Sequence, residues 1–310
     1  MKEFRRACDR SRWAIDRARM EAGDEKSTVR GPRRHRNWTL FKIALMGFGV
    51  LLRVSGLWRR GVRNALAVEL EEVELRFERL PAAFDGYRIL QISDPHLDAM
   101  PEFAERIASL VRRAPVDLCV LTGDYRFRVH GPFDGVRAAF DRLLPEIDAA
   151  DGIFAILGNH DSVEMVPMFE AQGVHVLVNQ TVSLSRGAAL LHLTGVDDAY
   201  YYYTENASHA LLHAPDGFRV ALAHSPELAS KAADAGVDLY LTGHTHGGQV
   251  CLPGRIAVFT HSLAPHRLAS GLWREGAMTG YTSRGAGCSG LPVRFNCPGE
   301  VTVFTLRRAG

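Results

Sequence analysis

Two histidines separated by one residue, His244 and His246, lie in a glycine-rich stretch behind a mostly apolar run. The run, Val237–Leu241, predicts a buried strand. In a loop directly after a strand, alternate side chains can point the same way, so the two imidazoles can converge on one point. Gly243 lets the backbone turn tightly beside them. The motif predicts either a metal site or a pair of hydrogen-bonded loop histidines.

The same arrangement recurs where four earlier apolar runs end. Each run predicts a strand, and an Asp, His or Asn follows its carboxyl end. These further candidate ligands are Asp94, His96, Asp124, Asn159 and His224. Strands that alternate with helices predict an α/β domain, in which ligand residues gather at strand carboxyl ends. A role in a turn or as a helix cap would account for any one of these polar residues at a strand end. It does not account well for all seven candidates together.

The residue types in this set indicate the chemistry. Two Asp, one Asn and four His suit borderline divalent ions such as Mn, Fe, Zn or Co. The set holds no thiolate, which argues against a structural zinc site. Two ions roughly 3.5–4 Å apart, joined by a carboxylate, can clamp a phosphoryl group and lower the pKa of a bound water. The leaving oxygen then needs a general acid. His160, beside the ligand Asn159, is the candidate, with Asp161 as the residue that orients it.

Taken together, these motifs resemble the calcineurin-like metallophosphoesterase superfamily over about residues 87 to 250. The motifs, in the order of the family, are Asp94-Pro95-His96, Gly123-Asp124, Gly158-Asn159-His160-Asp161, His224 and Gly243-His244-Thr245-His246. The resemblance implies a four-layer α/β/β/α sandwich of two mixed sheets with helices outside. It also implies a dinuclear, metal-dependent hydrolase.

The resemblance assigns each ligand to one of two divalent ions. One ion would be held by Asp94, His96, Asp124 and His246. The other would be held by Asp124, Asn159, His224 and His244. Asp124 would therefore bridge the two ions, and His160 would be the acid that protonates the leaving group.

The chain departs from the family pattern at two positions. Pro95 stands where the family usually has an aliphatic or polar residue, and proline removes a backbone N–H without having to move the ligands. Some members carry a second Asp three residues after the bridging one, where this chain has Phe127. Arg126, Arg128 and His130 follow the bridging Asp instead. They predict either contacts to a substrate phosphate or a solvated basic loop.

The carboxyl-terminal segment resembles a bacterial branch that has an amino-terminal membrane segment. The similar stretches are residues 281–285 and 292–295. That branch includes cell-envelope phosphoesterases and UDP-diacylglucosamine pyrophosphatases of lipid A biosynthesis. We therefore expect hydrolysis of a phosphodiester or pyrophosphate bond, with a lipid-linked nucleotide such as UDP-diacylglucosamine as the substrate. The alternatives are a phosphodiesterase or phosphatase on a soluble substrate, and a non-catalytic scaffold, which the complete ligand set disfavours.

Basic residues concentrate at the amino terminus. Residues 1–63 hold 17 Lys and Arg against 6 Asp and Glu, whereas the remainder holds 20 against 29. Such asymmetry predicts a basic arm that meets an anionic partner. The predicted organisation is a basic arm over residues 1–37, a membrane-associated helix over 38–63 and a catalytic domain over 64–310. The arm has no aromatic platform on which bases could stack, so we expect no nucleic-acid partner.

The apolar segment over residues 38–63 is short for a membrane span. Its uncharged core, Ile43–Leu52, is ten residues long, whereas a spanning helix needs roughly 20. Small and basic residues recur at helical spacing, at Lys42, Gly49, Arg53, Gly56, Arg60 and Arg63, and form one stripe. This pattern predicts a helix in the membrane interface, on the cytoplasmic face and against anionic lipid. The alternatives are a short tilted span that leaves the catalytic domain outside the membrane, and a helix packed on the catalytic domain.

Overall fold

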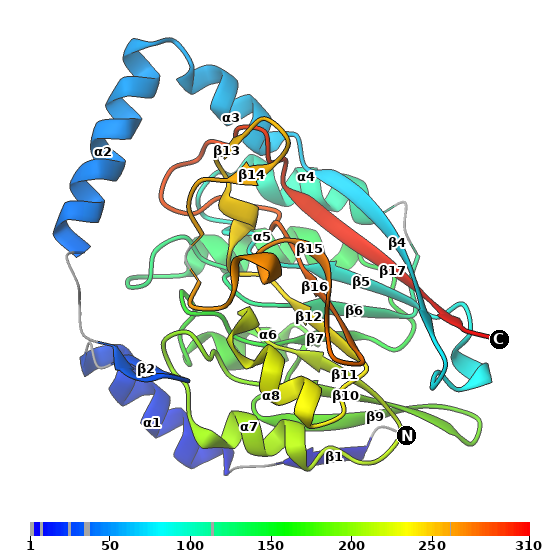
Figure 1. Cartoon of the computed structure of the whole chain (residues 1–310). Coiled ribbons are helices and arrows are strands. Elements are labelled where there is room, and N and C mark those ends of the chain that lie inside the picture. The colour runs from blue at the N-terminus through cyan, green and yellow to red at the C-terminus, as the bar shows by residue number, and fades with distance from the viewer. Residues whose placement is uncertain (1–2, 7–8, 24–25, 34–37, 113–114, 261) are drawn as a thin grey trace.

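Two mixed β-sheets face each other in this protein, with helices on their outer sides (Figure 1). The computed structural model describes residues 3–6, 9–23, 26–33, 38–112, 115–260 and 262–310. Within them the strand order is β4-β17-β5-β6-β7-β8 in one sheet and β1-β9-β10-β11-β12-β16-β15 in the other.

The six-stranded sheet supplies the first three ligand loops. Its strands are β4 (Glu69–Phe77), β5 (Arg88–Ile92), β6 (Leu118–Leu121), β7 (Ile153–Ala155), β8 (His175–Val176) and β17 (Glu300–Arg308). Strands β5 to β8 run parallel, whereas β17 pairs antiparallel with β5. Strand β6 is buried along its whole length, as expected for a parallel strand covered on both faces.

The seven-stranded sheet supplies the other ligand loops. Its strands are β1 (Glu3–Arg6), β9 (Gln180–Arg186), β10 (Ala189–Gly195), β11 (Phe218–Leu222), β12 (Leu239–Thr242), β15 (Gly271–Glu275) and β16 (Met278–Thr282). The central strands β10, β11, β12 and β16 are parallel, and β9 and β15 are antiparallel to their neighbours.

Three apolar cores separate the layers. Phe154 and Phe304 of the six-stranded sheet meet Leu193 and Leu241 of the seven-stranded sheet in the central core. On the outer side of the first sheet lie α4 (Glu102–Val111), α5 (Asp134–Leu143) and α6 (Met165–Ala171). On the outer side of the second lie α7 (Glu205–Leu212) and α8 (Ala229–Asp234). This arrangement confirms the predicted four-layer α/β/β/α sandwich.

The described part of the amino-terminal arm lies against the sandwich. Strand β1 pairs antiparallel with β9 at the edge of the seven-stranded sheet. Helix α1 (Arg10–Gly23) buries Trp13 and Arg17, and the hairpin of β2 (Lys26–Thr28) and β3 (Gly31–Arg33) follows it. The described part of the arm that was predicted over residues 1–37 therefore packs on the catalytic domain.

Two helices, not one, form the segment that was predicted to be a continuous helix. Helix α2 (Trp38–Val54) and helix α3 (Trp58–Leu66) meet at 104°. The break falls at Gly56, which adopts a φ of +76° that side chains disfavour. The predicted stripe is therefore interrupted after Arg53. By length and composition no single helix among the described residues could cross a membrane, whereas the bent pair meets that test.

Candidate metal centre

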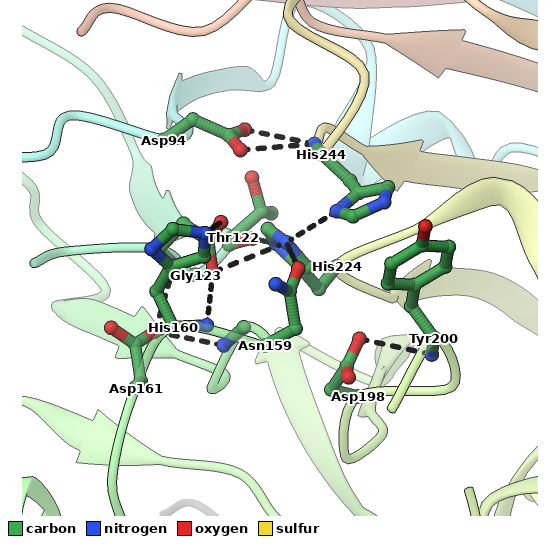
Figure 2. Close-up of polar contacts among 12 residues, drawn as sticks. Asp94, Thr122, Gly123, Asn159, His160, Asp161, Asp198, Tyr200, His224 and His244 are labelled. Atoms are coloured by element: carbon green, nitrogen blue, oxygen red, sulfur yellow. Dashed lines mark hydrogen bonds and ion pairs between the residues drawn. The ribbon is translucent and has the colours of Figure 1, made fainter. Parts of the chain in front are cut away.

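All seven predicted ligands lie at one edge of the molecule, between the two sheets. Asp94, Asp124 and Asn159 follow β5, β6 and β7 of the six-stranded sheet, while His224 and His244 follow β11 and β12 of the other. His96 and His246 stand two residues beyond Asp94 and His244. Because the carboxyl ends of these parallel strands meet where the sheets face each other, ligands far apart in the sequence converge, as Figure 2 shows for Asp94, Asn159, His224 and His244.

Asp94, His96 and His246 form the first group of ligand atoms, which all lie within 4.8 Å of one another. The Nε2 atoms of the two imidazoles are 3.2 Å apart, and that of His246 is 3.5 Å from the carboxylate of Asp94. The Nδ1 atom of His96 donates to the carbonyl of Arg126 at 2.7 Å. That bond leaves the lone pair of Nε2 directed into the site.

Asp124, His224 and His244 form the second group. The Nδ1 atom of His224 donates to the carbonyl of Thr122 at 2.8 Å, which again leaves Nε2 free to face the site. Around that Nε2 lie the Nδ1 atom of His244 at 3.2 Å, the side-chain oxygen of Asn159 at 3.1 Å and a carboxylate oxygen of Asp124 at 3.3 Å. Four lone-pair atoms therefore point at one region, which suits a cation.

Asp124 stands between the two groups and turns one oxygen toward each. Its Oδ1 atom is the one near His224, while its Oδ2 atom lies 3.8 Å from Nε2 of His96 and 3.9 Å from Nε2 of His160. Asp124 is almost fully buried. A buried carboxylate with Oδ2 near His96 of the first group and Oδ1 near His224 of the second suits a bridging ligand.

The proposed ligands differ in protonation. Burial, reinforced by nearby imidazoles, lowers the pKa of His96 to about 3 and that of His246 well below its ordinary value. Burial alone would raise the pKa of Asp124, but His224 and His160 outweigh it and hold that pKa well below its usual range. Asp124 in turn raises the pKa of His224 well above its ordinary value despite burial, and burial raises the pKa of Asp94 to about 7. Imidazoles bind metals in the neutral form and carboxylates in the ionised form, so a cation at this site would displace the protons of these two groups. The donor set therefore fits divalent ions.

The predicted acid, His160, is oriented by a backbone carbonyl. Its Nδ1 atom donates to the carbonyl of Phe127 at 2.7 Å. The carboxylate of Asp161, which was predicted to orient the imidazole, accepts instead from the backbone N–H groups of Asp124, Tyr125 and Gly158 at 2.7–2.9 Å. Asp161 thus holds together the two loops that carry Asp124 and His160.

The three predicted phosphate-binding residues are placed differently from one another. The guanidinium of Arg126 is buried and donates to the backbone carbonyls of His160, Val129 and Gly131. Arg128 and His130 are exposed. Arg126 therefore braces its own loop against the acid loop, and contact of any of the three with substrate stays a prediction.

Several residues of the site were not singled out from the sequence. Arg294 is fully buried and donates to the carbonyls of His246 at 3.3 Å and Gly287 at 2.6 Å, so it supports the last ligand loop. The ring of Tyr200 packs on that of His244 at 4.1 Å between centroids, and its backbone N–H donates to Asp198 (Figure 2). A run of four tyrosines was the signal in the sequence, but nothing in its spacing places it beside a ligand.

Comparisons with known proteins agree with this geometry. The family model described as calcineurin-like phosphoesterase matches residues 87–248. The metallophosphoesterase YkuE of Bacillus subtilis is 31% identical over 77% of this chain and 86% of its own length. The phosphodiesterase YaeI of Escherichia coli is 29% identical over 84% of this chain and 93% of its own.

Among solved structures, the phosphopantetheinyl hydrolase of Mycobacterium tuberculosis matches with a TM-score of 0.42 and 12% identity, over 66% of this chain and 91% of that one. The family match and the level of identity to the relative from Bacillus subtilis decide the assignment. The chain belongs to the calcineurin-like phosphoesterase family and is a metal-dependent hydrolase of phosphate esters.

Proposed function

We propose that the protein uses two divalent ions to hydrolyse a phosphodiester or pyrophosphate bond. The observation that carries this proposal is Asp124, whose two oxygens face separate groups of imidazoles. The first ion would be held by Asp94, His96, Asp124 and His246, and the second by Asp124, Asn159, His224 and His244. When bound, such a pair supplies Lewis-acid stabilisation of the phosphoryl group.

The protein's own residues would supply the proton for the leaving oxygen and hold the proton donor in place. His160 lies at the border of the site and is only partly exposed. Its Nδ1 atom donates to the carbonyl of Phe127, and its Nε2 atom lies 3.9 Å from Oδ2 of Asp124. We assign to His160 the donation of a proton from Nε2 to the leaving oxygen.

We further propose that the enzyme works at the surface of an anionic bilayer, on the cytoplasmic face. An exposed apolar face supports this. It comprises Leu40, Ile43, Met46, Val50, Leu51 and Val54 of α2 together with Leu252, Ile256, Val258 and Phe259 in and beside the hairpin of β13 (Cys251–Leu252) and β14 (Ile256–Ala257). The rings of Phe41 and Phe259, 5.7 Å apart, join the two parts. The same and adjoining segments carry exposed basic residues, Lys42 on α2, Arg59, Arg60 and Arg63 on α3, and Arg255 in the hairpin, which suits anionic lipid.

Contacts on both sides of α2 favour an interfacial position over a single span. Before α2, strand β1 pairs with β9 and Arg17 is buried in the sandwich. After α3, β4 enters the six-stranded sheet. A single crossing through α2 would separate these two parts by the thickness of a bilayer, roughly 30 Å of hydrocarbon. Because the segments before α2 and after α3 both belong to the sandwich, α2 can lie along the surface of the bilayer without crossing it.

Helix α2, which carries part of the apolar face, packs with its buried side close to a segment that contacts a ligand loop, and this supports a lipid-linked substrate. A side chain at Gly49 of α2 would meet Leu291 at 3.5 Å. The carbonyl of Leu291 accepts from the side chain of Gln249, three residues after the ligand His246. A substrate whose acyl chains stay in the bilayer could present its phosphates to the site from this side. We propose a lipid-linked nucleotide such as UDP-diacylglucosamine.

Hydrolysis assays would test the substrate. Protein loaded with Mn, Fe, Zn or Co is compared on a UDP-linked diacyl sugar in vesicles, a cyclic nucleotide and a simple phosphomonoester. We expect the fastest turnover on the lipid-linked pyrophosphate. Faster turnover of the cyclic nucleotide would favour a soluble substrate, and no hydrolysis by the metal-loaded protein would contradict the catalytic proposal altogether.

Vesicle flotation would test the bilayer proposal. Met46→Glu and Ile256→Glu place a charge in each part of the apolar face, and Leu212→Glu on α7 is the matched control because Leu212 is 62% exposed and Ile256 60%. We expect the first two to weaken binding to anionic vesicles and the control to bind normally. High salt should weaken wild-type binding as well, because salt screens the basic residues. Equal binding by all variants would contradict the proposed face.

A further inference from the structure

A single guanidinium connects the amino-terminal helix to the loop that carries the proposed acid. Arg17 on α1 is fully buried. Its Nη2 atom donates to the carbonyl of Gly158 at 3.0 Å and to that of Asp161 at 2.9 Å. Those two carbonyls stand immediately before the ligand Asn159 and immediately after the acid His160. One side chain therefore ties both ends of the segment that carries the two functional residues.

The rest of the guanidinium is held as firmly as the part that contacts the loop. Its Nη1 atom pairs with the carboxylate of Asp197, and its Nε atom donates to Glu21 at 2.8 Å. The face of the guanidinium stacks on the ring of Tyr202 at 3.6 Å. The planar fork of arginine can serve these partners at once, which the single ammonium of lysine cannot.

Other residues of α1 strengthen the same connection. The indole N–H of Trp13 donates to Asp197 at 2.6 Å, so Asp197 joins two side chains of the helix. Glu21 accepts from the hydroxyl of Ser162 at 2.9 Å and from the backbone N–H of Val163 at 3.0 Å. One face of α1 therefore makes hydrogen bonds to the loop from residue 158 to residue 163.

The location of α1 makes these contacts unusual. The helix precedes α2, whereas every ligand and the acid follow it. Within the described residues the carbonyl of Asp161 receives its hydrogen bond from Arg17, whereas that of Gly158 also accepts from the backbone N–H of Asp161 at 3.3 Å. A buried carbonyl that loses its donor is destabilising. Without Arg17 the loop would have to shift or admit water.

We propose that Arg17 is a positioning residue for the reaction, which holds the loop so that Asn159 and His160 both face Asp124. The amino-terminal helix thereby completes the active site of the domain that follows α2. This inference rests on the proposed function of His160. It differs from it in assigning the placement of the loop to a residue outside the catalytic motifs.

The test compares Arg17→Met with Arg12→Met in the full-length protein. Arg12 lies on the same helix, and its side chain is 85% exposed. We expect Arg17→Met to speed hydrogen exchange of the amides in residues 158–163. We also expect it to slow an alkyl phosphodiester, which needs protonation, by roughly 10–100-fold, since a displacement of about 1 Å can cost that much. An aryl ester with a good leaving group should be slowed much less. Arg17→Lys should recover part of the loss, and Arg12→Met should match the wild type.

Unchanged exchange in the loop, or an equal loss on both esters, would overturn the proposal. His160→Gln is measured alongside as the reference for a missing acid. If His160→Gln itself shows no preference for the aryl ester, the assignment of the acid fails, and the exchange result alone then decides whether Arg17 holds the loop. If Arg17→Met does not fold, Arg17→Lys and Glu21→Gln carry the same comparison, because Glu21 bonds both Arg17 and the loop.

Discussion

The Nδ1 atom of His160 lies 2.7 Å from the backbone carbonyl of Phe127, to which it donates its proton. Phe127 occupies the position at which related proteins can carry an aspartate that orients the acid. Here the backbone carbonyl of the same residue makes that bond, and its ring packs edge-on against the ring of His96 at 6.1 Å between centroids. The bond fixes the tautomer and leaves Nε2 facing Asp124 at 3.9 Å.

Replacement of the acid should depend on the leaving group. We expect His160→Gln to keep its metal ions and to slow esters with poor leaving groups by roughly 10²–10⁴. Activated aryl esters should suffer less because their leaving oxygens need less protonation. Phe127→Leu is the matched control, since it keeps the carbonyl and an apolar side chain against His96, and it should retain the wild-type preference. Rates on a series of phenyl esters check this, and an equal loss across the series would mean that His160 binds phosphate instead.

Removal of charge from the bridging carboxylate should affect both ligand groups. Asp124→Asn should lower metal affinity and abolish nearly all turnover, because both groups lose the charge they share. Bound metal measured after equilibrium dialysis, together with turnover, checks this. Near-normal activity with two ions per chain would contradict the bridging assignment.

A side chain at Gly243 should disturb the first ligand. A Cβ atom there would overlap Oγ of Ser93 and Oδ2 of Asp94. We expect Gly243→Ala to lower the free energy of unfolding by about 1–3 kcal/mol, as overpacking does, and to weaken metal binding. In Gly135→Ala, on α5, the nearest atom is 3.6 Å away, so this control should keep both properties. Denaturant titration and metal titration measure them.

One histidine away from the metal centre should add to acid sensitivity. Burial lowers the pKa of His192 from its ordinary 6.5, and its ring is held by Ser183 and the carbonyl of Asp216 at 2.9 and 3.1 Å. The stability that neutral His192 contributes is therefore complete above pH 6.5 and is lost as the pH falls below it. The slope is at most about 1.4 kcal/mol per pH unit. We expect the unfolding free energy of His192→Gln to fall less than that of the wild type between pH 7 and pH 5.

The sequence alone determined the fold class and named the seven candidate ligands. Apolar runs that each end in an Asp, Asn or His indicate strands with ligands at their carboxyl ends, since short-range spacing controls both features. The four-layer architecture was then confirmed by the two facing sheets. The break at Gly56 was missed because a glycine among helix-forming residues marks a possible end of a helix without requiring one.

Only the tertiary structure decided what supports those ligands. The contacts of Arg17 with Gly158 and of Arg294 with His246 join residues separated by 141 and 48 positions, and no local pattern encodes such pairs. An arginine in a basic arm and one in a buried loop look alike in the sequence, because charge and spacing are the same whether the guanidinium meets water or a backbone carbonyl. Which of them it meets depends on how the two sheets pack and on which helix covers the loop between them.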